Sequence, residues 1–154
     1  MGTKRVGLAR TQKLIEGLKR ELILNSTLKA AKKETITVTA TSKTLTAADS
    51  GATVILAGGS ASTVTLPAAT DGAYFEFFAQ SAQAHVVQAA SNILQGAVYD
   101  NSNTASGGSI ARTAINDGTS ITIANGAVGD SLSVVSDGTN WYVKGWLNDT
   151  PTVA

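Results

Sequence analysis

The sequence predicts a mainly β fold, namely a single β-sandwich or jelly-roll-like domain preceded by a short amphipathic N-terminal helix. Three observations predict it. From residue 35 onward, β-branched residues alternate with polar ones; ten such segments follow one another between Gly, Asn and Asp; and helical spacing of apolar residues occurs only before residue 35. A chain of 154 residues is long enough for one well-buried core. We therefore expect a helical arm, residues 1–34, and a β-rich body, residues 35–154.

The arm has the pattern of an amphipathic helix. Leu8, Ile15, Leu18 and Leu22 are spaced seven, three and four residues apart, which places them on one helical face. An isolated helix of this length is barely stable in water, so this stripe should be covered by the same helix in sister chains or by a partner. Packing of the helix on its own β-body is the alternative.

Charge is divided unequally between the two parts. The arm holds nine Lys or Arg against three Glu, a net charge of +6, and the body holds three Lys or Arg against eight Asp or Glu, a net charge of −5. The residues that we expect to bind a partner are the basic ones of the arm: Lys4, Arg5, Arg10, Lys13, Lys19 and Arg20. They could neutralise phosphates, but the arm contains no aromatic residue on which bases could stack. A complementary acidic protein surface explains the same charges equally well, and a solvated helix face explains most of them, so nucleic acid is not expected.

Ten segments of the body are expected to be strands. They are Ile36–Val38, Thr53–Ala57, Val64–Leu66, Tyr74–Ala79, His85–Ala89, Ile93–Tyr99, Ile110–Ile115, Ser120–Ala124, Ser131–Val135 and Trp141–Trp146. Their short lengths and regular spacing are typical of a sandwich or barrel.

The connections between strands carry recognisable turn residues. The dipeptides Asp71-Gly72, Asp117-Gly118 and Asp137-Gly138 lie where a tight hairpin needs a positive backbone φ, so each is expected to reverse the chain. Residues 100–109 lack an apolar residue to hold them in the core and are expected to form a longer exposed loop. No repeat is strong enough to predict a solenoid.

The sequence offers little for catalysis or for a cofactor. It has no cysteine and one histidine, His85, which stands in an expected strand and is interpreted as a core, edge or interface residue. Glu76 lies between two phenylalanines, and in a strand its side chain points away from both, which favours a solvated or partner-facing role over a catalytic acid. We therefore expect no enzyme activity, no metal site and no cofactor. The apolar runs are also too short for a membrane segment.

Two parts of the body resemble β-rich virion proteins of tailed bacteriophages. One begins with Leu-Thr-Ala-Ala-Asp-Ser-Gly at residues 45–51 and continues through Val-Thr-Leu-Pro at 64–67 to Tyr-Phe-Glu-Phe at 74–77. The other is Ser-Asp-Gly-Thr-Asn-Trp-Tyr-Val at residues 136–143. Such segments recur in capsid decoration proteins, head fibres and tail-fibre modules, and the similarity covers most of residues 45–146.

The start of the chain resembles small structural proteins of marine and cyanobacterial phages. Residues 1–10, Met-Gly-Thr-Lys-Arg-Val-Gly-Leu-Ala-Arg, lead into Ile-Glu-Gly-Leu-Lys-Arg at 15–20. The resemblance implies a trimeric decoration or cement protein on the virion surface that binds neighbouring major-capsid subunits. It brings no catalytic residues.

Aromatic residues near the C-terminus favour an interface. In an expected strand Trp141 and Val143 share one face and Tyr142 and Lys144 the other, so Trp141 is expected in the core and Tyr142 at an oligomer interface. The alternative function is a head-fibre or tail-fibre module that binds a host-surface glycan through the loop 100–109 and Tyr142. A depolymerase acting through Glu76 and a DNA-binding arm are further alternatives.

Overall fold

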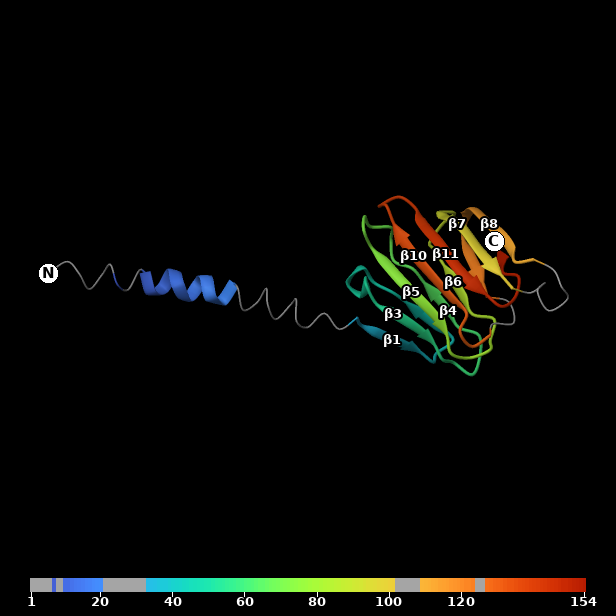
Figure 1. Cartoon of the computed structure of the whole chain (residues 1–154), viewed down its shortest axis with the longest axis horizontal. Helices are drawn as coiled ribbons and strands as arrows, with labels where there is room; N and C mark the ends of the chain where they lie inside the picture. The colour runs from blue at the N-terminus through green and yellow to red at the C-terminus, as the bar shows by residue number, and fades with distance from the viewer. Residues whose placement is uncertain (1–6, 8–9, 21–32, 102–108, 124–126) are drawn as a thin grey trace. The chain divides into compact units, whose positions relative to one another are not determined.

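A computed structural model describes residues 7, 10–20, 33–101, 109–123 and 127–154 of the chain (Figure 1). The chain divides into two compact units, Met1–Lys33 and Glu34–Ala154. The boundary lies one residue before the end of the arm expected from the sequence.

The first unit contains a helix over residues 10–20, and every one of its side chains is exposed. Of the expected apolar stripe, Ile15 and Leu18 lie on this helix with 47% and 51% of their surface exposed, and Leu14 beside them is 68% exposed. The helix does not cover these side chains by itself. Leu8 and Leu22, and the basic residues Lys4 and Arg5, lie outside the described residues.

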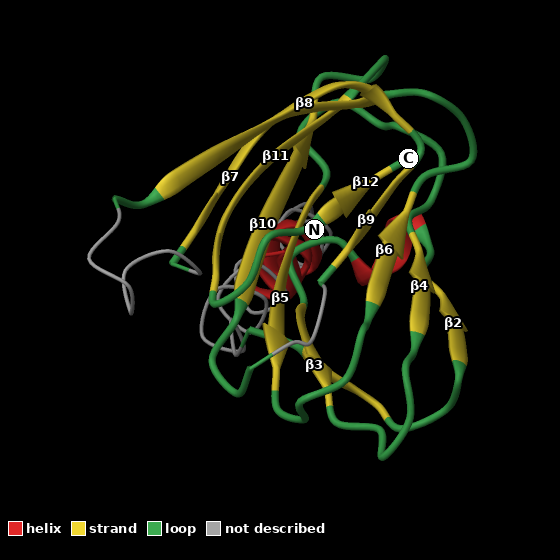
Figure 2. Ribbon diagram, turned by 90° about the vertical axis from the view of Figure 1, so that its right-hand side faces the viewer, coloured by secondary structure: helices red, strands yellow, loops and turns green. Residues whose placement is uncertain are grey.

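The second unit is a β-sandwich of two sheets, as Figure 2 shows. The prediction of a mainly β fold with a short N-terminal helix is confirmed. Sheet A has the order β1-β3-β5-β10-β11-β7-β8, with bounds Thr35–Val38, Thr53–Leu56, Tyr74–Ala79, Ser131–Ser136, Trp141–Leu147, Leu94–Asp100 and Ala111–Gly118. Sheet B has the order β12-β9-β6-β4-β2, with bounds Thr152–Val153, Ser120–Thr122, Val86–Gln88, Thr63–Thr65 and Ser42–Thr44.

The first six strands wind as a spiral. Odd-numbered strands enter sheet A and even-numbered strands enter sheet B, so β1, β3 and β5 pair in parallel, as do β2, β4 and β6. From β6 onward antiparallel pairs appear, although β11 still runs parallel to β7. The body is thus a sandwich whose N-terminal half is wound like a short two-sheet solenoid, which the sequence did not reveal.

The core lies between the sheets and follows from alternation along each strand. On β5, Phe75 and Phe77 point inward and are almost completely buried, and on β11 Trp141 does the same. The rings of Phe75 and Trp141 lie 5.8 Å apart with a tilt of 43°, one of the arrangements that aromatic pairs favour. Sheet B supplies aliphatic side chains opposite them, among them Val64, Val87 and Ile121. The expectation that Trp141 belongs to the core is confirmed.

The three Asp-Gly dipeptides share a backbone feature but not a connection type. Positive φ values occur at Gly72 (75°), Asp117 (53°) and Gly138 (91°). Only Asp137-Gly138 joins hydrogen-bonded neighbours, β10 and β11. Asp71-Gly72 lies between β4 and β5, and Asp117-Gly118 forms the end of β8, just before β9. At both places the chain passes from one sheet to the other. The expectation of three hairpins was therefore wrong for two of them, because a positive φ turns the chain without fixing where the next strand pairs.

All ten expected strands exist, and two more were missed. β2, with the sequence Ser-Lys-Thr, has no apolar residue and forms an exposed edge. β12 comprises two residues after Pro151 and pairs with β9. A 3-10 helix, η1 (Ala47–Asp49), follows β2, where the carboxylate of Asp49 accepts hydrogen bonds from the backbone N–H and the hydroxyl of Thr46.

Candidate functional site

The outer face of sheet A carries a concentration of exposed aromatic side chains, which we call the aromatic face. The chain has eight aromatic residues, of which Phe75, Phe77 and Trp141 are buried. The other five all point outward from sheet A, with exposed fractions between 38% and 59%: Tyr74, Phe78, Tyr99, Tyr142 and Trp146. Exposed apolar patches of this kind mark interaction surfaces in soluble proteins.

The register of the central strands arranges this face in rows. Strands β5 and β11 both run antiparallel to β10 and lie on either side of it. Each outward residue of β10 therefore stands between one residue of β5 and one of β11. The three rows are Tyr74, Val135, Tyr142; Glu76, Ser133, Lys144; and Phe78, Ser131, Trp146.

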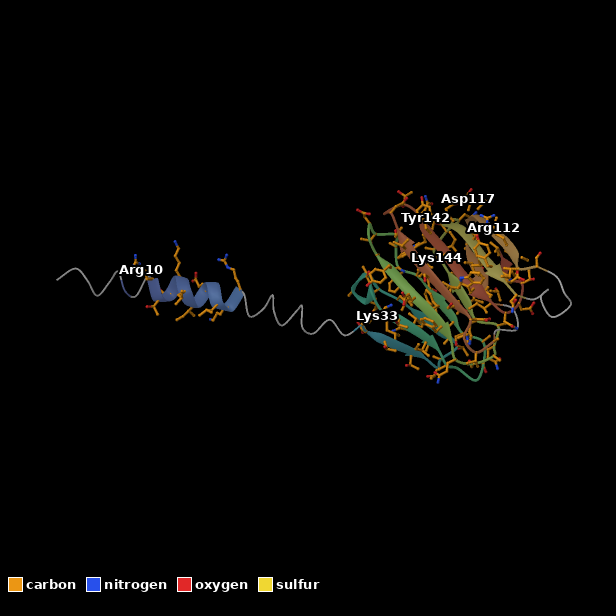
Figure 3. The ribbon with its side chains drawn as sticks, in the orientation of Figure 1. Arg10, Lys33, Arg112, Asp117, Tyr142 and Lys144 are labelled. Atoms are coloured by element: carbon orange, nitrogen blue, oxygen red, sulfur yellow. The ribbon has the colours of Figure 1, made fainter. Side chains whose placement is uncertain are left out.

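A shallow groove runs over β10 within this face. Its volume is about 320 Å³, and its walls include Tyr74 and Glu76 on one side and Tyr142 and Lys144 on the other. The groove exists because Ser133, in the middle of β10, is short, whereas the residues that flank it on β5 and β11 are long. Tyr142 and Lys144 are labelled on β11 in Figure 3.

The aromatic face extends beyond β11 to the next strand. Tyr99 on β7 pairs with Trp146, and their rings stack with centroids 5.3 Å apart and an interplanar angle of 27°. On the opposite side, Ile55 of β3 pairs with Phe78 and also points outward. Apolar side chains therefore line this face from β3 to β7, with only Ser131 of β10 between Phe78 and Trp146.

Tyr142 is held in position by the turn that precedes it. Its phenol donates a hydrogen bond of 2.9 Å to the carboxylate of Asp137, which also accepts the backbone N–H groups of Thr139 and Asn140. These bonds lower the pKa of Asp137, the backbone N–H of Asn140 most strongly, and the bond to Asp137 raises the pKa of Tyr142. The side chain expected at an interface is exposed, at 44%, and partly preorganised.

Glu76 lies where alternation placed it. Phe75 and Phe77 on either side of it are buried, and Glu76 itself is half-buried on the outer face, in the same row as Lys144. The neighbours given by the register are a serine, a threonine and a lysine rather than a second carboxylate. This arrangement fits a contact residue better than one member of a paired acid and base.

His85 is a buried structural residue. The backbone N–H of Ser62 donates to its Nδ1 at 3.1 Å, so the proton of the neutral ring is on Nε2, which lies 3.0 Å from the Ser81 hydroxyl. That hydroxyl donates in turn to the carbonyl of Gly58 at 2.6 Å. Burial lowers the pKa of His85, and a hydrogen bond with the backbone of Ser81 opposes this shift only in part. His85 therefore links three chain segments inside the sandwich, and its interpretation as a core residue agrees with this geometry.

The expected partner-binding residues are only partly described. Arg10, Lys13, Lys19 and Arg20 lie exposed on the N-terminal helix, where Arg10 is labelled in Figure 3. Of the expected loop 100–109, residues 102–108 lie outside the described residues. Asp100, which was expected to be exposed, instead ends β7 and is completely buried.

Sequence reasoning selected one residue of the aromatic face, Tyr142, as an interface residue. It grouped Trp146 with the terminal aromatics that could supply contact area, and it missed the other three. The signal was present in each strand separately, since alternation in residues 74–78 and 141–146 places Tyr74, Phe78 and Trp146 outward.

Two kinds of site are absent from the described residues. Within the described ranges, no group of three or more His, Cys, Asp or Glu side chains is placed to hold a metal ion. In the same part of the chain, no helix is long and apolar enough to span a membrane.

The chain was also compared with known proteins. No protein-family model, no curated protein and no solved structure matches it.

Proposed function

We propose that the chain is a non-enzymatic structural protein of a tailed-phage virion, namely a capsid decoration or cement protein. In this role the basic arm binds the outer surface of the major capsid protein, and the β-body covers the junctions between capsid subunits. A protein that binds only the assembled shell stabilises that shell by mass action.

The observation that carries the proposal is the N-terminal helix. Its basic residues and its apolar residues Ile15 and Leu18 are all exposed, and they belong to a compact unit separate from the β-body. Such a helix gains stability when a partner covers its apolar side. An acidic, partly apolar protein surface can both pair with the basic residues of the helix and cover its apolar residues.

The first experiment is immunogold electron microscopy of virions, with an antibody against the β-body. Label over the whole head supports decoration. Label confined to the tail or to one vertex contradicts it and favours the fibre alternative.

A second experiment tests the arm directly. A full-length variant with Arg10, Lys13, Lys19 and Arg20 changed to glutamine should lose binding to expanded capsids and keep the circular dichroism spectrum of the β-body. A matched control changes Lys43, an exposed residue of β2 in the body, to glutamine and should bind normally. Normal binding by the arm variant would refute the role of the arm.

The contact residues of the fibre alternative are described only in part. Its contact residues were the loop 100–109, of which only Asp100, Asn101 and Ser109 are described, and Tyr142, whose hydroxyl donates to Asp137.

A further inference from the structure

The aromatic face has an internal symmetry that a binding surface for an unrelated partner does not require. Each outward residue of β5 has a counterpart at the same height on β11: Tyr74 opposite Tyr142, Glu76 opposite Lys144, and Phe78 opposite Trp146. Strand β10 separates the members of each pair. Two of the pairs are aromatic with aromatic, and the middle pair is acidic with basic.

From this arrangement we infer that the aromatic face binds a second copy of the same chain, in a two-fold contact whose axis runs along β10. A two-fold axis in the plane between two facing sheets, parallel to β10, places β5 of one copy over β11 of the other. Because β5 and β11 are both antiparallel to β10, they run in the same direction, as this superposition requires. The surface is therefore complementary to itself, which is the condition for an isologous dimer.

Charge gives the contact its register. In the two-fold arrangement Glu76 of each copy faces Lys144 of the other, so two opposite-charge contacts form, one on each side of the axis. A displacement by one row would place both charges against aromatic rings. Charges of this kind fix register and partner choice more than they add affinity.

Shape agrees with charge. The outward residues of β10, which lie along the axis, are Ser131, Ser133 and Val135. Because the two serines are short, they leave space between the facing β10 strands, into which the long side chains of β5 and β11 can lean. Packed sheets stand about 10 Å apart, a spacing that side chains from both faces fill together. The aromatic pairs Tyr74 with Tyr142 and Phe78 with Trp146 can then stack with an offset.

The exposed aromatic side chains supply a large part of the area that a stable contact needs. Aromatic side chains bury roughly 150–250 Å² each when fully covered, so five that are 38–59% exposed present on the order of 450 Å² per copy. Val135 at 48% exposure and Ile55 on the flanking strand add to this. A standard specific interface buries about 800 Å² per partner, of which the aromatic rings would supply more than half.

The inference does not depend on the virion role proposed above, nor on any association of the arms. A dimer held together by the β-bodies dissociates to monomers when the aromatic face is disrupted. If the arms also associate in threes, as the resemblance implies, two trimers joined through the aromatic face form a hexamer, which dissociates to trimers instead. In both cases the diagnostic result is a twofold loss of mass.

The test uses full-length chains with reversed charges, measured by sedimentation velocity. Glu76→Lys and Lys144→Glu should each weaken self-association by about 100-fold or more, because each places two like charges opposite each other. Mixing the two variants should restore the assembly, since the lysine introduced at position 76 of one chain then faces the glutamate introduced at position 144 of the other. The double variant Glu76→Lys/Lys144→Glu should also assemble. The control Lys43→Glu makes the same charge change on sheet B and should leave the mass unchanged.

Iodide quenching of tryptophan fluorescence gives an independent readout. Trp141 is buried in the sandwich and Trp146 is 59% exposed, so only Trp146 should be protected by assembly and become accessible in the single variants. A wild-type chain that is monomeric at 100 µM would overturn the inference. So would single variants that keep the wild-type mass, or a mixture that fails to reassemble; binding of a glycan by monomeric wild type would assign the face to that ligand instead.

Discussion

Replacing His85 with alanine should destabilise the β-body by about 3–5 kcal/mol. The backbone N–H of Ser62, buried inside the sandwich, loses its acceptor, and leaving such a donor unsatisfied costs about 1–3 kcal/mol. Removing the ring from a fully buried position adds a cavity cost of about 2 kcal/mol, the low end for large-to-alanine changes. Urea unfolding monitored by circular dichroism measures the sum.

His85→Asn is the matched control. The asparagine Oδ1 can take the place of Nδ1 and accept the N–H of Ser62, whereas the contact with Ser81 is lost. We expect this variant to recover about half of the loss seen with alanine. If alanine costs less than about 1 kcal/mol, or if asparagine is no better than alanine, the hydrogen bond of Ser62 is not what makes His85 stabilising.

The same residue predicts how stability depends on pH. Burial lowers the pKa of His85 in the folded chain below the ordinary value of 6.5, so the unfolded chain binds a proton that the folded chain refuses. The free energy of unfolding is therefore not reduced by His85 above about pH 6.5. It falls as the pH drops from there toward the pKa of His85 in the folded chain, with a limiting slope of about 1.4 kcal/mol per pH unit for one proton. His85 is the only histidine, and His85→Asn should remove this slope between pH 7 and 5. An unchanged slope in the asparagine variant would refute the reasoning.

Three other predictions concern the β-body. Gly96→Ala should abolish folding or lower the stability by more than about 3 kcal/mol, because φ is 129° and a Cβ would lie 2.1 Å from the carbonyl oxygen of Val143. Gly129→Ala is the control: its φ is 102° and the space around it is open, so it shows the backbone cost alone, about 1–3 kcal/mol. Equal shifts of the melting temperature in the two variants would contradict this account. Asp130→Ala should cost about 2–4 kcal/mol in thermal unfolding, since the buried carboxylate accepts the backbone N–H groups of Ala127 and Asn148, and Asp130→Asn, which keeps one acceptor, should cost about half as much. Asp137→Asn should lower the pKa of Tyr142 toward 10.0, because the phenol loses its carboxylate acceptor and the neighbouring negative charge. Ultraviolet titration near 295 nm measures this pKa, and Tyr142→Phe assigns the signal. An unchanged pKa would show that the hydrogen bond is absent in solution.

Local sequence patterns predicted the strands but not their neighbours. Alternation in residues 74–79 and 141–147 was strong enough to place each strand and its buried face, and the polar edge strand β2 was missed because it lacks an apolar residue. Strands β5 and β10 pair although they are more than fifty residues apart in the sequence. Strands β10 and β11, in contrast, are joined by a tight turn. Only the turn leaves a signal in the sequence.

The aromatic face shows why the site was harder to predict than the strands. Alternation determined that Tyr74 and Tyr142 point outward, but their placement in one row depends on both strands pairing with β10. The spiral of the first six strands was hidden for a related reason. Turns such as Asp71-Gly72 look like hairpin turns, and only the packing of the two sheets decides that the chain crosses to the other sheet there.

The spiral also makes the N-terminal half of the body modular. Registered neighbours are separated by 18 and 23 residues in sheet A, from Thr35 to Thr53 to Glu76, and by 21 and 23 residues in sheet B. Because β1 and β2 are both edge strands, one whole coil of about this length can be deleted or duplicated there without exchanging the partners of any other strand. Each such event moves the point where the arm joins the body by one strand spacing, about 4.8 Å, and leaves the rows on β5, β10 and β11 unchanged. The fold thus allows the distance between the first strand of the body and the aromatic face to be adjusted in discrete steps.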